Sequence, residues 1–226
     1  MIAYLKCEKM SPLVKERERF ITHKMTTGIP ETERILALLG QAEVVRAREL
    51  SAQGVHPMTL QRLVEKGIVE REGRGLYRLA EKEVSEHYSL LQAAKRVPQG
   101  VICLLSALRF HQLTTQKPFE VWLMLERGSR RPVVDMPPLR IHYLSGEAFR
   151  AGIEEHVKDS VTLRVYSPAK TVADCFKFRY KIGMDVALEA LRETLRQKRA
   201  TVDDIWRYAE LCRVARVIYP YLEALD

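Results

Sequence analysis

Sequence patterns that identify common enzyme classes are missing from this chain of 226 residues. No glycine is followed by lysine, which excludes a phosphate-binding P-loop. No aspartate has an acid two positions later, as a nucleotidyltransferase metal site requires, and no lysine has a carboxylate two positions before it, as a restriction-type nuclease requires. The motifs GxSxG and HExxH are absent as well. We therefore expect no enzymatic activity, no cofactor and no bound metal, and a nucleic-acid-processing enzyme with an unrecognised site stays the less favoured alternative.

Long hydrophobic runs and closely spaced cysteines are also lacking. The longest strongly apolar run near the middle, residues 101–108, is far too short to span a bilayer, and the N-terminus has no apolar signal segment. We therefore expect a cytoplasmic protein without a membrane partner. The cysteines, Cys7, Cys103, Cys175 and Cys212, form no CxxC motif. This spacing predicts reduced, mostly buried thiols rather than metal ligands.

Basic residues outnumber acidic ones, with 37 Lys and Arg against 29 Asp and Glu, giving a net charge of +8 and an isoelectric point near 9.4. This balance favours a polyanionic partner, although basic surfaces are also simply solvated. The length allows one large or two modest domains, and 46% hydrophobic residues are enough for a folded core.

Glycine and proline divide residues 31–67 into three predicted helices. The first ends at Gly40, the second spans residues 44–53 and stops at Gly54, and the third opens with His56-Pro57 and ends at Gly67. Glycine is typical just after a helix, and proline is tolerated in the first turn because its missing N–H would be unpaired there.

After Gly67 the hydrophobic period changes from helical to alternating. Two short alternating segments flank the tripeptide Gly73-Arg74-Gly75, which favours a β-hairpin with a glycine-rich tip. Three helices followed by a hairpin are typical of a winged helix-turn-helix, here predicted for residues 31–84.

The residues expected on the outer face of the third helix and on the wing suit DNA. Glutamine and arginine read purine edges, threonine reaches a phosphate or a thymine methyl, and lysine meets phosphate. The predicted DNA-binding residues are His56, Met58, Thr59, Gln61, Arg62, Lys66, Arg71, Arg74 and Arg78. Acids nearly balance the basic residues of this segment, so a winged helix that only docks a protein stays an alternative.

The flanking segments are less informative. Residues 1–30 form a basic leader, interpreted as a mobile extension or, alternatively, an arm that touches DNA backbone. For residues 85–226 we predict a larger mixed α/β domain with a helical C-terminus, which makes the whole chain α+β. Its predicted helices span 81–97 and 101–113, and its predicted strands span 119–125, 139–144 and 161–166.

The last 60 residues are predicted to be helical. Ser167-Pro168 begins one helix, and Thr201 with Asp204 resembles a capping box. Basic residues expected outside these helices form a second candidate patch for DNA backbone or an acidic partner, comprising Lys170, Lys177, Arg179, Lys181, Arg192 and Arg196. Asp174 is interpreted as a structural acid that orients backbone or pairs with a lysine, and the acidic cluster 154–156 as a helix surface.

The residues also resemble a known family. The hairpin sequence at 73–79 (GRGLYRL), Ser106-Ala107-Leu108 with His111 and Leu113, the run 166–179 (YSPAKTVADCFKFR), and the later Ile182-Gly183 and Val186–Ala190 occur together. In this combination, over residues 31–200, the chain resembles the AbiEi-type antitoxins of type IV toxin–antitoxin systems.

The resemblance implies an antitoxin that is also a transcriptional repressor. Its winged domain would bind inverted repeats in the promoter of its own operon, and its C-terminal domain would assist DNA binding and counteract a nucleotidyltransferase-like toxin. Monomers bound cooperatively to the two half-sites would satisfy the repeat. Direct contact with the toxin stays open. The leader departs from the family, so the chain starts at either Met1 or Met25.

Overall fold

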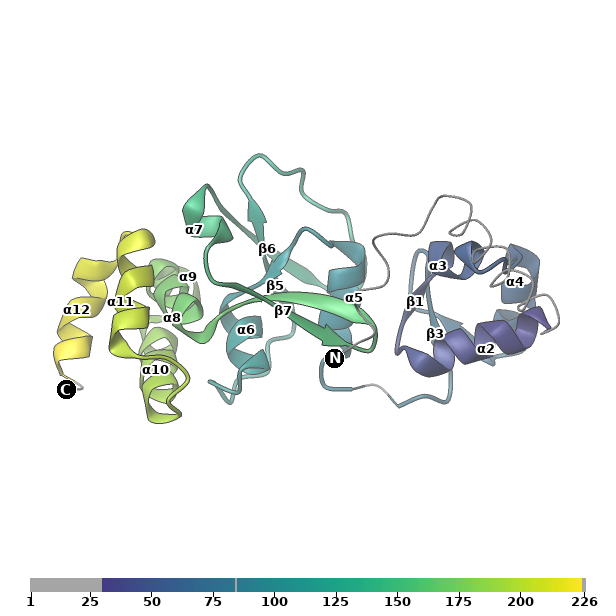
Figure 1. Ribbon diagram of the computed structural model, residues 1–226, viewed down its shortest axis with the longest axis horizontal. Coiled ribbons are helices and arrows are strands. Elements are labelled where there is room, and N and C mark those ends of the chain that lie inside the picture. Colours follow the sequence, from purple (N-terminus) through teal and green to yellow (C-terminus); the bar gives the residue numbers. More distant parts are fainter. Residues whose placement is uncertain (1–29, 84, 225–226) are drawn as a thin grey trace, which may run out of the picture.

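The computed structural model describes residues 30–83 and 85–224. The predicted basic leader and the choice between Met1 and Met25 lie outside these residues. In Figure 1 a small N-terminal unit stands at one end, a sheet occupies the centre and the last helices stand at the other end. Within the described ranges no helix is long and apolar enough to cross a membrane.

The N-terminal unit contains three helices and a three-stranded antiparallel sheet. The helices are α2 (Glu31–Gln41), α3 (Ala47–Ala52) and α4 (Pro57–Glu65), and the strands are β1 (Val45–Arg46), β2 (Val69–Arg71) and β3 (Leu76–Leu79), in the order β1-β3-β2. The elements expected of a winged helix-turn-helix therefore follow one another in the predicted order. Leucine, isoleucine and valine side chains from all three helices form one buried cluster with Val69 of β2.

Two details of this unit differ from the prediction. Helix α2 continues through Gly40 to Gln41. The single helix predicted for residues 44–53 is wrong at its start, because Val45 and Arg46 pair with Tyr77 and Leu76 of β3. A two-residue strand is too short to reveal its period in the sequence.

A five-stranded mixed sheet forms the centre, in the order β6-β5-β4-β8-β7. Its strands are β4 (Val101–Ile102), β5 (Val121–Glu126), β6 (Leu139–Leu144), β7 (Ile153–Lys158) and β8 (Val161–Tyr166). The strands predicted at 119–125, 139–144 and 161–166 are confirmed as β5, β6 and β8. Two neighbouring pairs, β4 with β8 and β5 with β6, are parallel.

The other two strands were missed. Residues 101–113 are not one helix, because β4 lies in the middle of the sheet and only Leu104–Phe110 form helix α6. Both residues of β4 are fully buried, so they lack the alternation that marks a strand. The acidic cluster 154–156 lies on β7, an edge strand paired with β8, and not on a helix.

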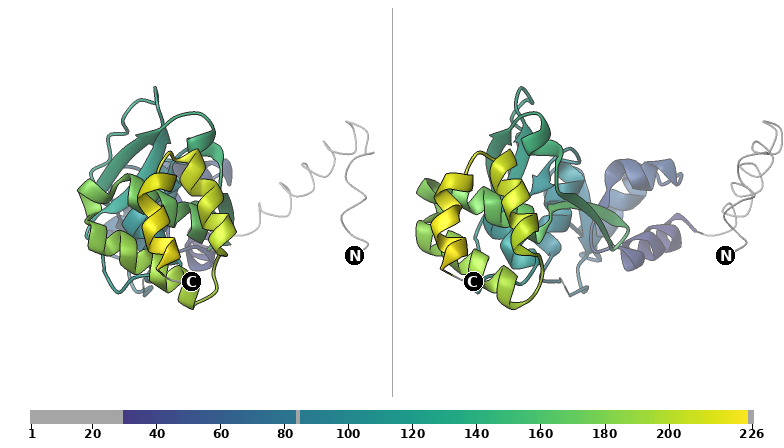
Figure 2. Two further views of the ribbon diagram at one scale, coloured as in Figure 1. Left: turned by 90° about the vertical axis from the view of Figure 1, so that its left-hand side faces the viewer. Right: turned by 60° about the vertical axis from the view of Figure 1, so that its left-hand side comes forward.

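Helices cover the two faces of this sheet. Alternate residues of β5 point to opposite faces: Val121, Leu123 and Leu125 pack in one apolar cluster, and Trp122 and Met124 in another. The first cluster includes α5 (Tyr88–Arg96), which is shorter than the predicted helix 81–97. The second includes α6 and the C-terminal helices (Figure 2). The mixed α+β class with a helical C-terminus is thereby confirmed.

The first cluster also contains Val44 and Leu76 of the N-terminal unit. The two parts of the chain therefore share apolar contacts, and the boundary proposed near residue 85 stays a prediction.

The C-terminal part is helical, as predicted. A short helix α7 (Glu147–Arg150) precedes β7, and after β8 follow α8 (Pro168–Lys177), α9 (Arg179–Ile182), α10 (Met184–Arg196), α11 (Val202–Leu211) and α12 (Ala215–Glu223). The Ser167 hydroxyl caps α8 by accepting the N–H of Lys170, and Thr201 with Asp204 forms the predicted capping box of α11. Cys103, Cys175 and Cys212 are buried free thiols, and Cys7 lies outside the described residues.

Lys170 is the clearest correction in this region. It was predicted to face outward, yet it is fully buried, and its Nζ lies 2.5 Å from Oδ2 of Asp174 and 4.1 Å from the ring centre of Tyr166. The Cys212 thiol donates to the other oxygen of Asp174, with the sulfur at 3.4 Å. The interpretation of Asp174 as the structural partner of a lysine is confirmed, and Lys170 leaves the candidate surface patch.

This buried pair yields a stability prediction. Replacing Asp174 with alanine leaves the Lys170 ammonium without an acid in the core, so Asp174→Ala should lower the free energy of unfolding by about 3–5 kcal/mol. Urea unfolding followed by tryptophan fluorescence measures this loss. Both tryptophans, Trp122 and Trp206, lie in this part of the chain.

Glu193→Ala is the matched control, because Glu193 and Arg196 form an exposed ion pair on α10. It should change the unfolding midpoint little, since exposed pairs are screened by water and salt. Equal losses for Asp174→Ala and Glu193→Ala would contradict the buried-pair account.

Candidate nucleic-acid interface

Helix α4 presents an exposed polar face. Leu60 and Leu63 are buried in the N-terminal core, so the helix turns Met58, Arg62 and Lys66 outward, with Met58 56% exposed. His56 precedes the helix as its N-cap, and its Nδ1 accepts the N–H of Met58 at 3.2 Å. The Arg62 side chain makes no hydrogen bond or ion pair with any residue in the described ranges, which leaves all its guanidinium donors available.

Two other predicted residues of α4 are engaged within the protein. The Thr59 hydroxyl donates to Oε2 of Glu31 at 2.5 Å, which lowers the pKa of that carboxyl and joins α4 to α2. Gln61 is exposed and its Nε2 donates to Glu65 one turn later, at 3.2 Å. Thr59 is therefore a helix-bracing residue, while Gln61 can exchange a weak surface contact for another partner.

The hairpin of β2 and β3, which is the predicted wing, also carries both free and internally bonded arginines. Arg71 and Arg74 are exposed, and Arg71 Nε donates only to the carbonyl of Gly73, at 3.4 Å. Arg74, at the tip, makes no hydrogen bond or ion pair with the described residues. Both stay candidates for contact with an anion.

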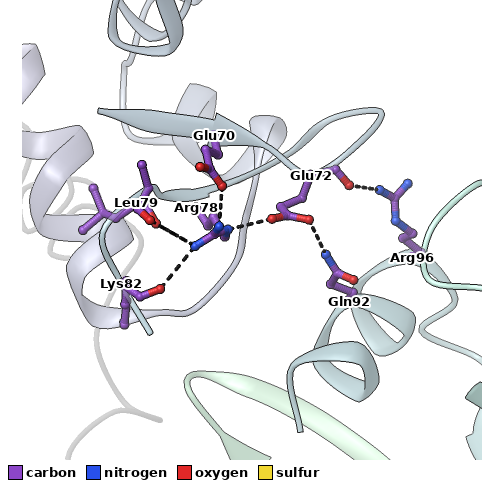
Figure 3. A network of polar contacts seen from close by, with 8 residues as sticks. Glu70, Glu72, Arg78, Leu79, Lys82, Gln92 and Arg96 are labelled. Atoms are coloured by element: carbon purple, nitrogen blue, oxygen red, sulfur yellow. Dashed lines mark hydrogen bonds and ion pairs between the residues drawn. The ribbon is translucent and has the colours of Figure 1, made fainter. Parts of the chain in front are cut away.

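Arg78 is a correction to the expected DNA-binding set. Its side chain is only 17% exposed, forms ion pairs with Glu70 and Glu72, and donates through Nη1 to the carbonyls of Leu79, Ala80 and Lys82 (Figure 3). With Nε, Nη1 and Nη2 all bonded inside the hairpin and the turn that follows, Arg78 holds the wing in shape and does not point freely toward a phosphate.

The same network continues into α5. Oε2 of Glu72 accepts Gln92 at 3.2 Å, and the Glu72 carbonyl accepts Arg96 Nη2 at 2.9 Å (Figure 3). Gly73 adopts φ +105°, and a Cβ there would lie 2.6 Å from Arg96 Nη2. The tip of the wing therefore packs against α5, and the positive φ of residue 73 favours glycine there.

Two further contacts fasten the N-terminal unit. Lys95 of α5 pairs with Glu49 of α3 at 2.6 Å, and the buried carboxylate of Glu43 accepts the N–H and hydroxyl of Ser85. The sequence prediction missed this interface, because its partners lie some 40 positions apart and form no local motif. A buried acid such as Glu43 cannot be recognised from sequence spacing alone.

The second predicted basic patch does not come together as one surface. Lys177 donates to the carbonyl of Cys212 at 2.8 Å, Arg179 to that of Phe176 at 2.9 Å, and Arg196 pairs with Glu193. Lys181 and Arg192 are exposed. Helices α8 to α10 also lie at the opposite end of the molecule from α4 (Figure 1). Four of the six predicted residues are thus engaged in internal contacts.

Comparison with known families identifies the N-terminal segment. Residues 33–80 match the family model described as "Transcriptional regulator, AbiEi antitoxin". This segment matches the AbiEi family. The resemblance found in the sequence is confirmed, and with it the general role of an antitoxin-type transcriptional regulator. The match spans α2 to β3, the elements that carry the exposed face of α4 and the wing.

The chain as a whole shares its fold with a solved structure. The crystal structure of the RV2827C protein from Mycobacterium tuberculosis superposes with a TM-score of 0.52 at 13% identity, covering 81% of this chain and 76% of that one. At this identity the likeness concerns the fold alone. Comparison with curated proteins found no match.

The Arg78 network predicts a structural defect. Arg78→Ala leaves Glu70 and Glu72 side by side without their cation, so it should lower the stability of the N-terminal unit by about 1–3 kcal/mol. Hydrogen exchange of the β2–β3 amides measures the loss directly.

Arg71→Ala on the same hairpin is the control, because Arg71 is exposed and has a single weak internal contact. Its exchange rates should match those of the unmodified protein. If Arg78→Ala leaves the hairpin amides as protected as Arg71→Ala does, Arg78 is not a structural residue.

Proposed function

We propose that this protein is a sequence-specific DNA-binding repressor that serves as the antitoxin of a type IV toxin–antitoxin system and represses its own operon through inverted repeats. The observation that carries the proposal is the exposed polar face of α4, with the unpaired guanidinium of Arg62, within a segment that matches the AbiEi family. The proposal includes no catalytic step, and places the protein in the cytoplasm with DNA.

The winged helix-turn-helix assignment gives each side chain a role. Helix α4 would enter the major groove, with Gln61 and Arg62 at base edges and Lys66 at a phosphate. Arg71 would meet the backbone from the wing. Thr59 and Arg78 are left out of this set, because their donors are used within the protein.

One observation favours a second candidate function. Met58 in the first turn of α4 and Ile68 just before β2 are 56% and 42% exposed, and apolar side chains at these positions suit a protein surface better than a phosphate. Under this alternative the N-terminal unit docks a protein partner and does not read an operator.

DNA binding by the full chain tests the proposal. The protein should bind a duplex from upstream of its own gene more tightly than a scrambled duplex of equal length. Arg62→Ala should weaken operator binding by about 1–3 kcal/mol if Arg62 reads a base, and Lys66→Ala should reduce the salt slope by about one unit if Lys66 meets a phosphate. Fluorescence anisotropy over a salt series measures both.

Arg216→Ala is the matched control, because Arg216 is an exposed arginine on α12, at the opposite end of the molecule from α4 (Figure 1). It should bind the operator as the unmodified protein does. Equal affinity for the two duplexes, with no effect of Arg62→Ala, would reject operator reading and favour the protein-docking alternative.

Antitoxicity is tested apart from DNA binding. Co-expression of the full chain should restore growth of cells inhibited by the paired nucleotidyltransferase-like toxin. Arg62→Ala should restore growth equally well when both genes are expressed from unrelated promoters, because α4 would act only at the operator. Failure of the unmodified chain to restore growth would remove the antitoxin part of the proposal and leave the repressor part standing.

A further inference from the structure

A groove lined by four arginines lies between the N-terminal unit and the loop that precedes β6. Arg46 and Arg48 approach it from β1 and α3, Arg74 from the wing tip and Arg96 from the end of α5. Val133, Val134 and Asp135 of the loop line it as well. Its volume is about 550 Å³, within the range of about 300–1,000 Å³ typical of small-ligand sites.

The positive charge of the groove is not neutralised by the protein. None of the four arginines forms an ion pair within residues 30–83 and 85–224, and the one acid in the lining, Asp135, forms none either. Two acids lie close in sequence to these arginines, Glu49 beside Arg48 and Glu72 near Arg74. Both form ion pairs with other residues, Glu49 with Lys95 and Glu72 with Arg78. The lining therefore carries a net charge that favours an anion with two or more negative charges.

The guanidiniums also retain free donors. Arg96 uses Nη2 for the Glu72 carbonyl, but its buried Nε has no partner among the described atoms. Burial and the neighbouring Arg48 and Arg96 lower the pKa of Arg46. Since a buried donor without a partner and like charges at close range both cost free energy, an anion in the groove would relieve both.

The shape of the groove favours a compact ligand. Arginine forks match the paired oxygens of a phosphate group. A duplex is a broad convex rod, whereas this hollow is bordered by the 133–135 loop, where Val133 is 91% exposed. An apolar wall opposite a cationic one suits a phosphate chain attached to a flat base.

We propose that the four-arginine groove is a binding site for a compact polyphosphate of the nucleoside diphosphate or triphosphate class. Such a ligand would touch the wing, α3, α5 and the loop at once. It would thereby tie the N-terminal unit more firmly to the central sheet. The site is separate from the exposed face of α4 and does not depend on operator binding.

Calorimetric titration of the full chain with inorganic pyrophosphate, and then with ADP, tests the site at constant ionic strength. One equivalent should bind. Arg46→Gln and Arg48→Gln should each weaken binding about tenfold or more, because each removes a charge-assisted donor pair. ADP should bind more tightly than pyrophosphate if the Val133 wall meets the base.

Arg216→Gln is the matched control and should bind as the unmodified chain does. Arg48 is exposed and its side chain forms no hydrogen bond or ion pair with the described residues, so Arg48→Gln should fold normally, and its thermal unfolding midpoint verifies this. Heat no larger than that of chloride at equal ionic strength would overturn the proposal. Equal binding by Arg46→Gln, Arg48→Gln and the unmodified chain would overturn it as well.

A parallel titration with duplex DNA distinguishes a small phosphate ligand from a DNA phosphate. If pyrophosphate and ADP do not bind, yet Arg46→Gln and Arg48→Gln weaken duplex binding and its salt slope, the groove holds a DNA phosphate and the small-ligand proposal is wrong. If both variants lose pyrophosphate but keep the duplex affinity of the unmodified chain, the groove is a separate ligand site. That result stands whether or not the protein reads an operator.

Discussion

The contacts made by Glu72 fix the geometry on which the rest of the N-terminal unit depends. Its carboxylate accepts Arg78 from within the hairpin and Gln92 from α5, and its carbonyl accepts Arg96. One residue thus joins the wing to itself and to the helix that covers the central sheet. Because Val44 and Leu76 also enter the core beside α5, the wing is held by both polar and apolar contacts.

This attachment decides which surfaces are available for a partner. A wing whose tip packs against α5 cannot swing as a free arm, so only its exposed Arg71 and Arg74 can meet an outside anion. Helix α4 lies on the far side of the unit from this interface (Figure 1). Reading of a groove would therefore fall to α4, while Arg74 faces the hollow between wing and loop.

The sequence predicted those parts of the fold that depend on patterns of neighbouring residues. Alternating residues identified β6 and β8, a run of aromatic and long or branched apolar residues identified β5, and proline after serine placed the start of α8. The sequence prediction failed where a strand forms only by pairing with residues far along the chain, as in the two-residue strands β1 and β4. The predictions for Lys170 and Arg78 failed for a related reason, because long basic side chains are usually solvated. Only the tertiary structure shows that Lys170 pairs with Asp174 and Arg78 with Glu70.

The near balance of acids and bases in residues 31–80 illustrates the same limit for function. In the folded chain Glu43 accepts a hydrogen bond from Ser85, and Glu49 forms an ion pair with Lys95. Glu70 and Glu72 both form ion pairs with Arg78. Most of the acids are thus committed to internal contacts, whereas Arg46, Arg48, Arg62 and Arg74 keep no acid among the described residues. A segment that is almost neutral by count therefore still carries arginines whose charge no acid of the described residues pairs. Because anions respond to the local field and not to the residue total, both α4 and the arginine groove can attract phosphate although composition alone does not predict it.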